Sequence, residues 1–314
     1  MHKNAFQNLI YYHYKSHKRI LPWRPPSLKL RKDKMVDDPY KIFVSEVMLQ
    51  QTQVTRVLVK YPEFIKRFPT FRSLARASLK DVLTVWQGMG YNRRGKFLKE
   101  AAGIIVKDKR YEFMFHNRLS FPRTRESIEL DRSRIKSGMT EQQMLKQVQH
   151  DNVDLLQLLP GVGHNTACAV VTYSFNMPTV FIETNIRAVY LYHFFKDKEN
   201  VSDSDILNRV KNTLDMQNPR DWYYALTDYG AMLKKTKKFQ NIQSKHYTKQ
   251  SKFEGSRRQL RGRILKLLIE SGPSSLNDIR SHLREDPRIE QIVEDMKNEG
   301  ILEIIQTHYR IVGS

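Results

Sequence analysis

The sequence has a single cysteine, Cys168, among its 314 residues. One cysteine cannot form an intramolecular disulfide or supply a multi-cysteine metal site, so zinc ribbons and cysteine-ligated iron–sulfur clusters are excluded. The patterns G-x-x-x-x-G-K-[ST] and G-x-G-x-x-G are also absent. Nucleotide hydrolysis and dinucleotide chemistry therefore have no supporting motif.

Long apolar runs are absent as well, and none reaches the roughly eighteen residues that a membrane span requires. Residues 1–20 mix polar and aromatic side chains and lack the apolar core of a signal peptide. We therefore expect a cytoplasmic protein with no membrane partner, associated with the nucleoid if its ligand is DNA.

Acidic residues are few beside the basic ones, because Lys and Arg number 54, Asp and Glu number 33, and the net charge is +21. A charge this positive predicts a polyanionic partner: DNA, RNA or an anionic membrane face. Apolar residues still make up 40% and aromatic residues 11% of the chain. This composition favours packed cores over wholesale disorder.

Helical spacing dominates the chain, and strand-type alternation is almost absent before residue 300. Apolar residues recur every three or four positions in 41–66, 73–87, 95–106, 153–159, 166–175, 185–195, 204–215 and 220–234. We predict an all-α main domain over residues 1–233 with short loops. Residues 117–150 are polar and Arg-rich, which indicates a surface insertion, partly disordered; an ordinary basic helix pair is the alternative.

The stretch that follows is the most basic part of the chain. Residues 234–263 hold seven Lys and four Arg against one acid, Glu254, with aromatic residues between them. Basic charge interleaved with aromatic rings suits phosphate contact and base stacking. We interpret residues 234–256 as a linker that also contacts nucleic acid; a solvated linker is the alternative.

Residues 257–314 are predicted to form a separate small α+β domain. Helical spacing covers 257–270, 275–283 and 288–299, and ILEIIQTHYRIV then suggests two short strands. Three helices followed by a hairpin is the winged-helix order, which often binds DNA through its third helix and can also dock proteins. The third helix carries acids as well as bases, which weakens the groove-reading interpretation.

The sharpest local motif is the turn Pro160-Gly161-Val162-Gly163, which is followed by Thr166 in a predicted helix. Two glycines around one apolar residue permit a tight turn that exposes successive backbone N–H groups. Together with a helix N-terminus, such a turn binds phosphate without any side-chain charge. We interpret it as a helix-hairpin-helix that binds the DNA backbone, with a plain helix–helix turn as the alternative.

Two carboxylates are candidates for a catalytic role. Glu46 lies inside the apolar run IFVSEVML, where lost hydration favours the neutral carboxyl that a general acid needs. Glu183 follows the apolar run TVFI and precedes a predicted helix, where it could be an ordinary cap or a fixed anion facing a developing cation. One acid and one anion are the pair that glycosidic cleavage requires.

Four segments form a larger pattern: LPWR (21–24), DPYKIFVSEVMLQQTQV (38–54), FPTFRSLARASLKDVLTVWQGMGYNRRGKFL (68–98) and LLPGVGHNTACAV (158–170). This pattern resembles MutY-type adenine DNA glycosylases of the helix-hairpin-helix superfamily, over residues 7–233 apart from the insertion. The resemblance implies two α-helical lobes with DNA and the active site between them. It also implies a monomer that flips adenine, mispaired with 8-oxoguanine or guanine, out of the duplex and leaves an abasic site.

The resemblance also assigns roles to single residues. Glu46 matches the glutamate that protonates adenine at N7, and Asn185 matches an active-site asparagine. The remaining matches line the base pocket, wedge into the base stack or hold the phosphate backbone, the last often with a monovalent cation. They are Trp23 and Arg24 for the pocket, Gln51 for the wedge, Tyr91 for a lesion contact, and Gly161, Val162, Gly163 and Thr166 for the backbone.

The chain departs from the family pattern in several places. Glu183 replaces the family's aspartate and is one methylene longer. Where most relatives begin four cluster-binding cysteines, this chain has basic residues, which implies a clusterless member whose basic stretch contacts DNA instead: Lys234, Lys235, Lys237 and Lys238. The winged-helix-like segment stands where typical members carry the domain that reads 8-oxoguanine. Asn92 follows Tyr91 in place of a second tyrosine.

Asn165 occupies the position of the Schiff-base lysine of bifunctional relatives of the endonuclease III type. An amide cannot form a Schiff base, so a monofunctional glycosylase is expected. Two alternatives stay open: a glycosylase for T·G or U·G mispairs, and a mispair-binding protein with impaired catalysis. The carboxyl of Glu46 argues against the second, because a protein without catalysis has no need for a costly carboxyl in an apolar helix.

Overall fold

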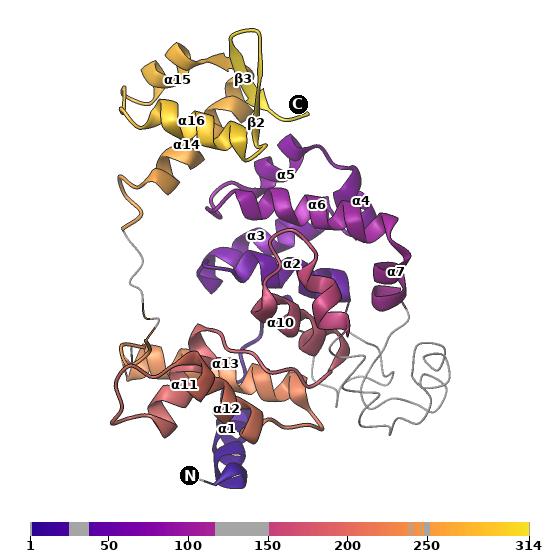
Figure 1. Cartoon of the computed structure of the whole chain (residues 1–314), viewed down its shortest axis with the longest axis vertical. Helices are drawn as coiled ribbons and strands as arrows, with labels where there is room; N and C mark the ends of the chain where they lie inside the picture. Colours follow the sequence, from indigo (N-terminus) through magenta and orange to yellow (C-terminus); the bar gives the residue numbers. More distant parts are fainter. Residues whose placement is uncertain are drawn as a thin grey trace. The chain divides into compact units, whose positions relative to one another are not determined.

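The computed structural model describes residues 2–24, 38–116, 151–237, 239, 241–245, 247 and 252–313 (Figure 1). The insertion predicted at 117–150 and Lys238 lie outside these residues. The chain forms two compact units. The first spans Met1–Ile42, Met114–Leu158 and Val162–Lys249, and the second spans Phe43–Phe113, Leu159–Gly161 and Gln250–Ser314. The domain boundaries predicted from the sequence stay a prediction.

The first unit is helical around an aromatic core. Its helices are α1 (Lys3–His17), α10 (His164–Phe175), α11 (Thr184–Phe194), α12 (Asp203–Thr213) and α13 (Pro219–Thr236). Phe6 of α1 meets Trp222 of α13 edge-on, with ring centroids 5.7 Å apart. Gly230 lets α13 approach α11 closely, because a Cβ at this position would lie 2.2 Å from the carbonyl oxygen of Asn185. These contacts place the start of α11 against α13.

The second unit contains the helices that follow Phe43. They are α2 (Pro39–Leu49), α3 (Val54–Arg67), α4 (Phe71–Arg76), α5 (Leu79–Trp86), α6 (Arg93–Lys107) and α7 (Lys109–His116), with α2 and α7 crossing the unit boundaries. The helical spacing over 41–66 is interrupted, because Gln51 has a φ of +52° and cannot continue α2. The spacing over 73–87 is interrupted by Ser78, which caps α5 by accepting a hydrogen bond from the Asp81 backbone N–H.

The C-terminal part of the second unit is a three-helix segment with a small sheet. It comprises α14 (Arg257–Ser271), β1 (Ser274–Ser275), α15 (Leu276–His282), α16 (Ile289–Asn298), β2 (Leu302–Ile305) and β3 (His308–Ile311). The antiparallel sheet has the order β1-β3-β2, with Leu302 opposite Ile311 and Ser274 opposite Tyr309. The hairpin expected after residue 300 therefore gains a short third strand.

The predicted fold class, an all-α chain with a small winged-helix-like α+β part, is confirmed. We call residues 257–313 the winged segment. Among the described residues, no helix combines the length and apolarity needed to cross a membrane.

Candidate functional site

Glu46 lies in the last turn of α2, surrounded in sequence by buried residues. Ser45 is 1% exposed, Val47 is 4% exposed and Met48 is fully buried, whereas Glu46 is half-buried. The side chains next to Glu46 are thus buried, while Glu46 itself keeps partial access to solvent. A carboxyl in this position combines partial loss of hydration with reach to a ligand, which is what a general acid requires.

Arg94 holds the end of α2, and the sequence reasoning overlooked it. Only 8% of this residue is exposed, and burial lowers the pKa of its guanidinium to about 10, so it stays charged at neutral pH. It donates hydrogen bonds to the carbonyl oxygens of Val47, Met48, Gln50, Met89 and Gly90 and to Thr52 Oγ1. A cation in the first turn of a helix interacts unfavourably with the helix dipole. The position of Arg94 in the first turn of α6 is therefore the one sequence signal that its guanidinium binds groups outside this helix.

The two chain segments that Arg94 joins each contain a residue in the left-handed region. Gln51 has a φ of +52° and Tyr91 a φ of +46°, conformations that cost a non-glycine residue about 1 kcal/mol or more. Both residues line a cavity of about 570 Å³ in the second unit, together with Gln50, Phe97, Gly161 and Arg258. Gln51 and Tyr91, two predicted site residues, are therefore brought together.

The glycine turn has the geometry that the sequence predicts for a hairpin. Gly161 has a φ of +74°, and a Cβ there would lie 2.9 Å from Cδ2 of Phe97, so both conformation and space require glycine. Its carbonyl oxygen accepts a hydrogen bond of 3.2 Å from Nε2 of Gln50. Gly163 is the N-cap of α10, Val162 is buried, and the first turn carries the exposed Asn165 and the half-buried Thr166.

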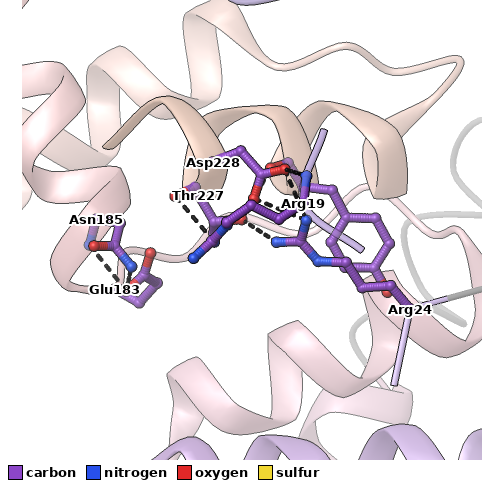
Figure 2. Close-up of polar contacts among 7 residues, drawn as sticks. Arg19, Arg24, Glu183, Asn185, Thr227 and Asp228 are labelled. Atoms are coloured by element: carbon purple, nitrogen blue, oxygen red, sulfur yellow. Dashed lines mark hydrogen bonds and ion pairs between the residues drawn. The ribbon is translucent and has the colours of Figure 1, made fainter. Parts of the chain in front are cut away.

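Glu183 is the N-cap of α11, and Figure 2 shows its polar contacts with Asn185. Its carboxylate accepts hydrogen bonds from the backbone N–H groups of Asn185 at 2.9 Å and Ile186 at 3.1 Å, and from Nδ2 of Asn185 at 3.3 Å. Burial lowers the pKa of the nearby Lys234 ammonium, and the charge of Glu183 opposes that shift. The carboxylate is thus a fixed anion at the positive end of a helix.

Arg24 is clamped by an aspartate that the sequence reasoning also missed (Figure 2). Its Nη1 lies 2.8 Å and 2.9 Å from the two carboxylate oxygens of Asp228, and its Nη2 donates to Thr227 Oγ1 at 2.8 Å. Arg19 binds the same carboxylate, whose side chain is 1% exposed. The clamp fixes the segment that carries the buried Trp23 onto α13; a pocket-lining role for Trp23 and Arg24 stays a prediction.

The remaining predicted residues are basic ones at the end of α13. Lys234 is half-buried, and Lys235 and Lys237 are exposed. Across the described part of the chain, no group of three or more His, Cys, Asp or Glu side chains could hold a metal ion. Burial raises the pKa of the Cys168 thiol to about 12. One buried thiol of this kind does not fit a cysteine-ligated cluster.

Comparison with known proteins places the chain in a family. Residues 44–212 match the HhH-GPD superfamily of base excision DNA repair proteins. The adenine DNA glycosylase of Mycobacterium tuberculosis is 34% identical over 182 residues, 58% of this chain and 45% of the relative. The human adenine DNA glycosylase is 34% identical over 187 residues, 59% of this chain and 27% of the relative. The chain thus spans less than half the length of these curated relatives.

A solved thermostable thymine-DNA glycosylase has a similar fold. It superposes with a TM-score of 0.50 at 20% identity, covering 73% of this chain and 86% of that one. At this identity the likeness supports the architecture alone. Since the superfamily match covers more than half of the residues and includes both Glu46 and the glycine turn, the chain belongs to the HhH-GPD superfamily of base excision DNA repair proteins.

Proposed function

We propose that this chain is a monofunctional adenine DNA glycosylase, which hydrolyses the N-glycosidic bond of adenine mispaired with 8-oxoguanine or guanine and leaves an abasic site. The observation that carries the proposal is the position of Glu46, a half-buried carboxyl at the end of a helix whose neighbouring side chains are buried. The adenine DNA glycosylases that are 34% identical to parts of this chain support the choice of base.

The reaction assigns different tasks to the two carboxylates. Glu46 donates its proton to N7 of the flipped adenine, so that the bond between the sugar C1′ and the base N9 breaks with its electron pair leaving on a neutral base. The sugar then carries oxocarbenium character, which the capped carboxylate of Glu183 stabilises. Water adds to C1′ and gives its proton back to Glu46, and Asn185 holds Glu183 through the bond of 3.3 Å.

DNA is the proposed partner, bound by a monomer. The net charge of +21 suits a polyanion, and the hairpin at Gly161 and Gly163 supplies backbone N–H groups for phosphates. Lys234, Lys235, Lys237 and Lys238 add positive charge toward the same partner, although Lys238 lies outside the described residues. The proposed enzyme works without an iron–sulfur cluster. The proposal includes a monovalent cation at the hairpin. With DNA as its partner, the protein is proposed to be cytoplasmic and associated with the nucleoid.

The test is single-turnover base release from duplexes that contain A·8-oxoguanine, A·G, A·C, T·G or U·G. Alkali reveals abasic product, and a sample without alkali reports strand cleavage, which is expected to be weak because Asn165 cannot form a Schiff base. Release of adenine opposite 8-oxoguanine or guanine supports the proposal. Release of thymine or uracil would show that the alternative mismatch glycosylase is correct.

A substitution of Glu46 separates catalysis from binding. Glu46→Gln is expected to slow adenine release by about 10²–10⁴-fold, the usual contribution of a general acid, while duplex affinity stays within about twofold. Glu63→Gln is the matched control, because Glu63 lies on α3 with a side chain that is 51% exposed. Base release at the wild-type rate in Glu46→Gln would show that the acid lies elsewhere.

A further inference from the structure

The winged segment is part of the second unit and shares its core. Leu79 and Leu83 of α5 belong to the same buried cluster as Ile264 and Leu268 of α14. Arg261 of α14 also pairs with Glu299, which lies 3.9 Å from Nε of Arg93 on α6. The side chains of α14 are therefore fixed relative to α5 and α6, and they can form part of a common site.

The third helix of the winged segment is poorly suited to bind DNA. α16 and its C-cap carry four acids, Glu290, Glu294, Asp295 and Glu299, and three of these pair with arginines outside the helix. Their partners are Arg280, Arg257 and Arg261, of which the last two lie on α14. A helix whose charged side chains are mostly acids is unfavourable for phosphate contact, so the other elements of the winged segment are better placed to contact DNA.

Arg258, on the first turn of α14, points to such a contact. Its Nη1 donates a hydrogen bond of 2.9 Å to Oη of Tyr91, and its guanidinium lies 5.3 Å from the centroid of the tyrosine ring. The guanidinium of Arg94 lies 5.5 Å from the same centroid. A guanidinium carries five N–H donors in a rigid fork, so this anchoring fixes the direction in which Arg258 presents them.

The cavity that Arg258 lines has the chemistry of a base-recognition site. It has a volume of about 570 Å³ and combines the Arg258 guanidinium with the amides of Gln50 and Gln51 and the rings of Tyr91 and Phe97. Rings stack on bases, amides bind base edges, and the arginine fork matches O6 and N7 of guanine. A phosphate would use the charge alone and would need neither ring nor amide.

The cavity also lies next to the proposed acid along the chain. Gln50 and Gln51 follow directly after α2, one turn beyond Glu46. We propose that Arg258 is a specificity-determining residue that donates to the O6 and N7 edge of a guanine opposite the target base, so that the winged segment takes part in reading the opposite strand. The inference rests on the proposed function, because it assumes that a base is flipped toward Glu46.

The first experiment measures single-turnover release from duplexes with adenine opposite guanine, 7-deazaguanine or cytosine. 7-deazaguanine lacks only the N7 acceptor. The wild-type preference for guanine over both other bases is expected to fall about tenfold in Arg258→Ala, the order that one arginine–guanine contact contributes. The rate opposite cytosine is expected to stay the same. Arg263→Ala, an exposed arginine on α14, is the control and keeps the preference.

Arg258→Lys separates a base contact from a phosphate contact. Lysine keeps the charge but lacks the fork, so the guanine preference is expected to fall as it does in Arg258→Ala. An equal loss of rate opposite every base, restored by lysine, would assign Arg258 to a phosphate and overturn the proposal. A guanine preference that survives in Arg258→Ala would overturn it as well.

A binding measurement separates this inference from the proposed function. Duplexes with a tetrahydrofuran abasic analogue opposite guanine or cytosine report on the cavity without any base release. Tighter binding opposite guanine that depends on Arg258, in a protein that releases no adenine, would refute the proposed function and support the base-reading role. Normal adenine release with a binding preference independent of Arg258 would support the proposed function and refute the base-reading role of Arg258.

Discussion

Glu46 and Glu183, the two carboxylates of the proposed reaction, are held in different ways. Glu46 stands inside a helix whose end is fixed by Arg94, which lies 46 positions beyond its partner Met48. Glu183 stands before the first residue of α11 and is fixed by the backbone N–H groups of Asn185 and Ile186. The position of the first carboxylate therefore depends on tertiary contacts, whereas the second is positioned by local backbone geometry. A side chain that keeps the cap should keep its position at 183, whether or not it keeps the charge.

The sharpest test of this difference is a matched pair of substitutions at position 183. The aspartate and asparagine side chains of Glu183→Asp and Glu183→Asn have the same length. Both are good N-caps, but only aspartate keeps the negative charge. We expect Glu183→Asp to release adenine at the wild-type rate or faster. Glu183→Asn is expected to be slower by about 10²-fold, the order that loss of one electrostatic stabiliser costs. Single-turnover rates on A·G duplexes measure both.

Thermal unfolding supplies the control for this pair. The two variants are expected to unfold at similar temperatures, and Glu183→Ala, which loses the cap, is expected to lose about 1 kcal/mol of stability. Equal rates in Glu183→Asp and Glu183→Asn would mean that Glu183 only caps α11. A large loss of rate in Glu183→Asp would mean that the site is built around the longer side chain.

The second prediction concerns Arg94, whose hydrogen bonds hold the end of the helix that carries Glu46. Arg94→Met keeps much of the side-chain volume but leaves the backbone carbonyl groups around Arg94 without their donor. We expect a loss of about 3 kcal/mol in the free energy of unfolding, the size typical of breaking a buried charged network. Adenine release is expected to slow about tenfold or more, because the end of α2 shifts and small misplacements of a catalytic group are costly.

Arg93→Met is the reference for this substitution. Arg93 precedes Arg94, but its side chain is 55% exposed and it makes one weak ion pair, at 3.9 Å to Glu299. Its loss is expected to change the free energy of unfolding by less than about 0.5 kcal/mol. Chemical denaturation of both variants measures the difference, and equal stability would show that the bonds of Arg94 do not hold α2.

The smallest expected effect concerns the helix that Glu183 begins. Nε2 of His193, near the other end of α11, lies 3.1 Å from Oη of Tyr229. Burial lowers the pKa of His193 from 6.5 to about 4. Between these values the unfolded chain binds a proton that the folded chain does not. Stability is therefore expected to fall as the pH decreases from about 6.5 toward 4, lowering the melting temperature by a few degrees.

His193→Gln is expected to flatten this acid dependence. The exposed His2 provides the control, because His2→Gln should leave the pH dependence unchanged. Burial and His17 also lower the pKa of His13, so a residual slope is expected in His193→Gln. A melting temperature that does not change between pH 7 and 5 in the wild-type protein would contradict the low pKa of His193.

Much of the fold could be predicted because its signals are local. Apolar residues three and four apart indicated the helices, and the glycines at 161 and 163 indicated the turn before α10. The order of elements in the winged segment followed from the same spacing. The break at Gln51 and the strand at Ser274–Ser275 were missed, because they depend on Arg94 and on pairing with β3, which lie far away in sequence.

The site was predictable to the same extent. The sequence indicated Glu46, Glu183, Gln51 and the glycine turn, since their motifs are short and contiguous. It did not indicate Asp228 as the partner of Arg24, Arg94 as the support of α2, or Arg258 as a neighbour of Tyr91. Nothing in the spacing of a charged residue tells which distant residue will neutralise or anchor it.

The sequence by itself thus determined the helical class, the excess of positive charge, the lack of cluster-binding cysteines and the two carboxylates. Each of these follows from composition or from residues within a few positions of one another. Only the tertiary structure decided which arginines are held by acids, which support backbone carbonyls and which line a cavity. The physical reason is that these roles depend on burial and on partners 46 to 204 positions away, which become neighbours only when the chain packs.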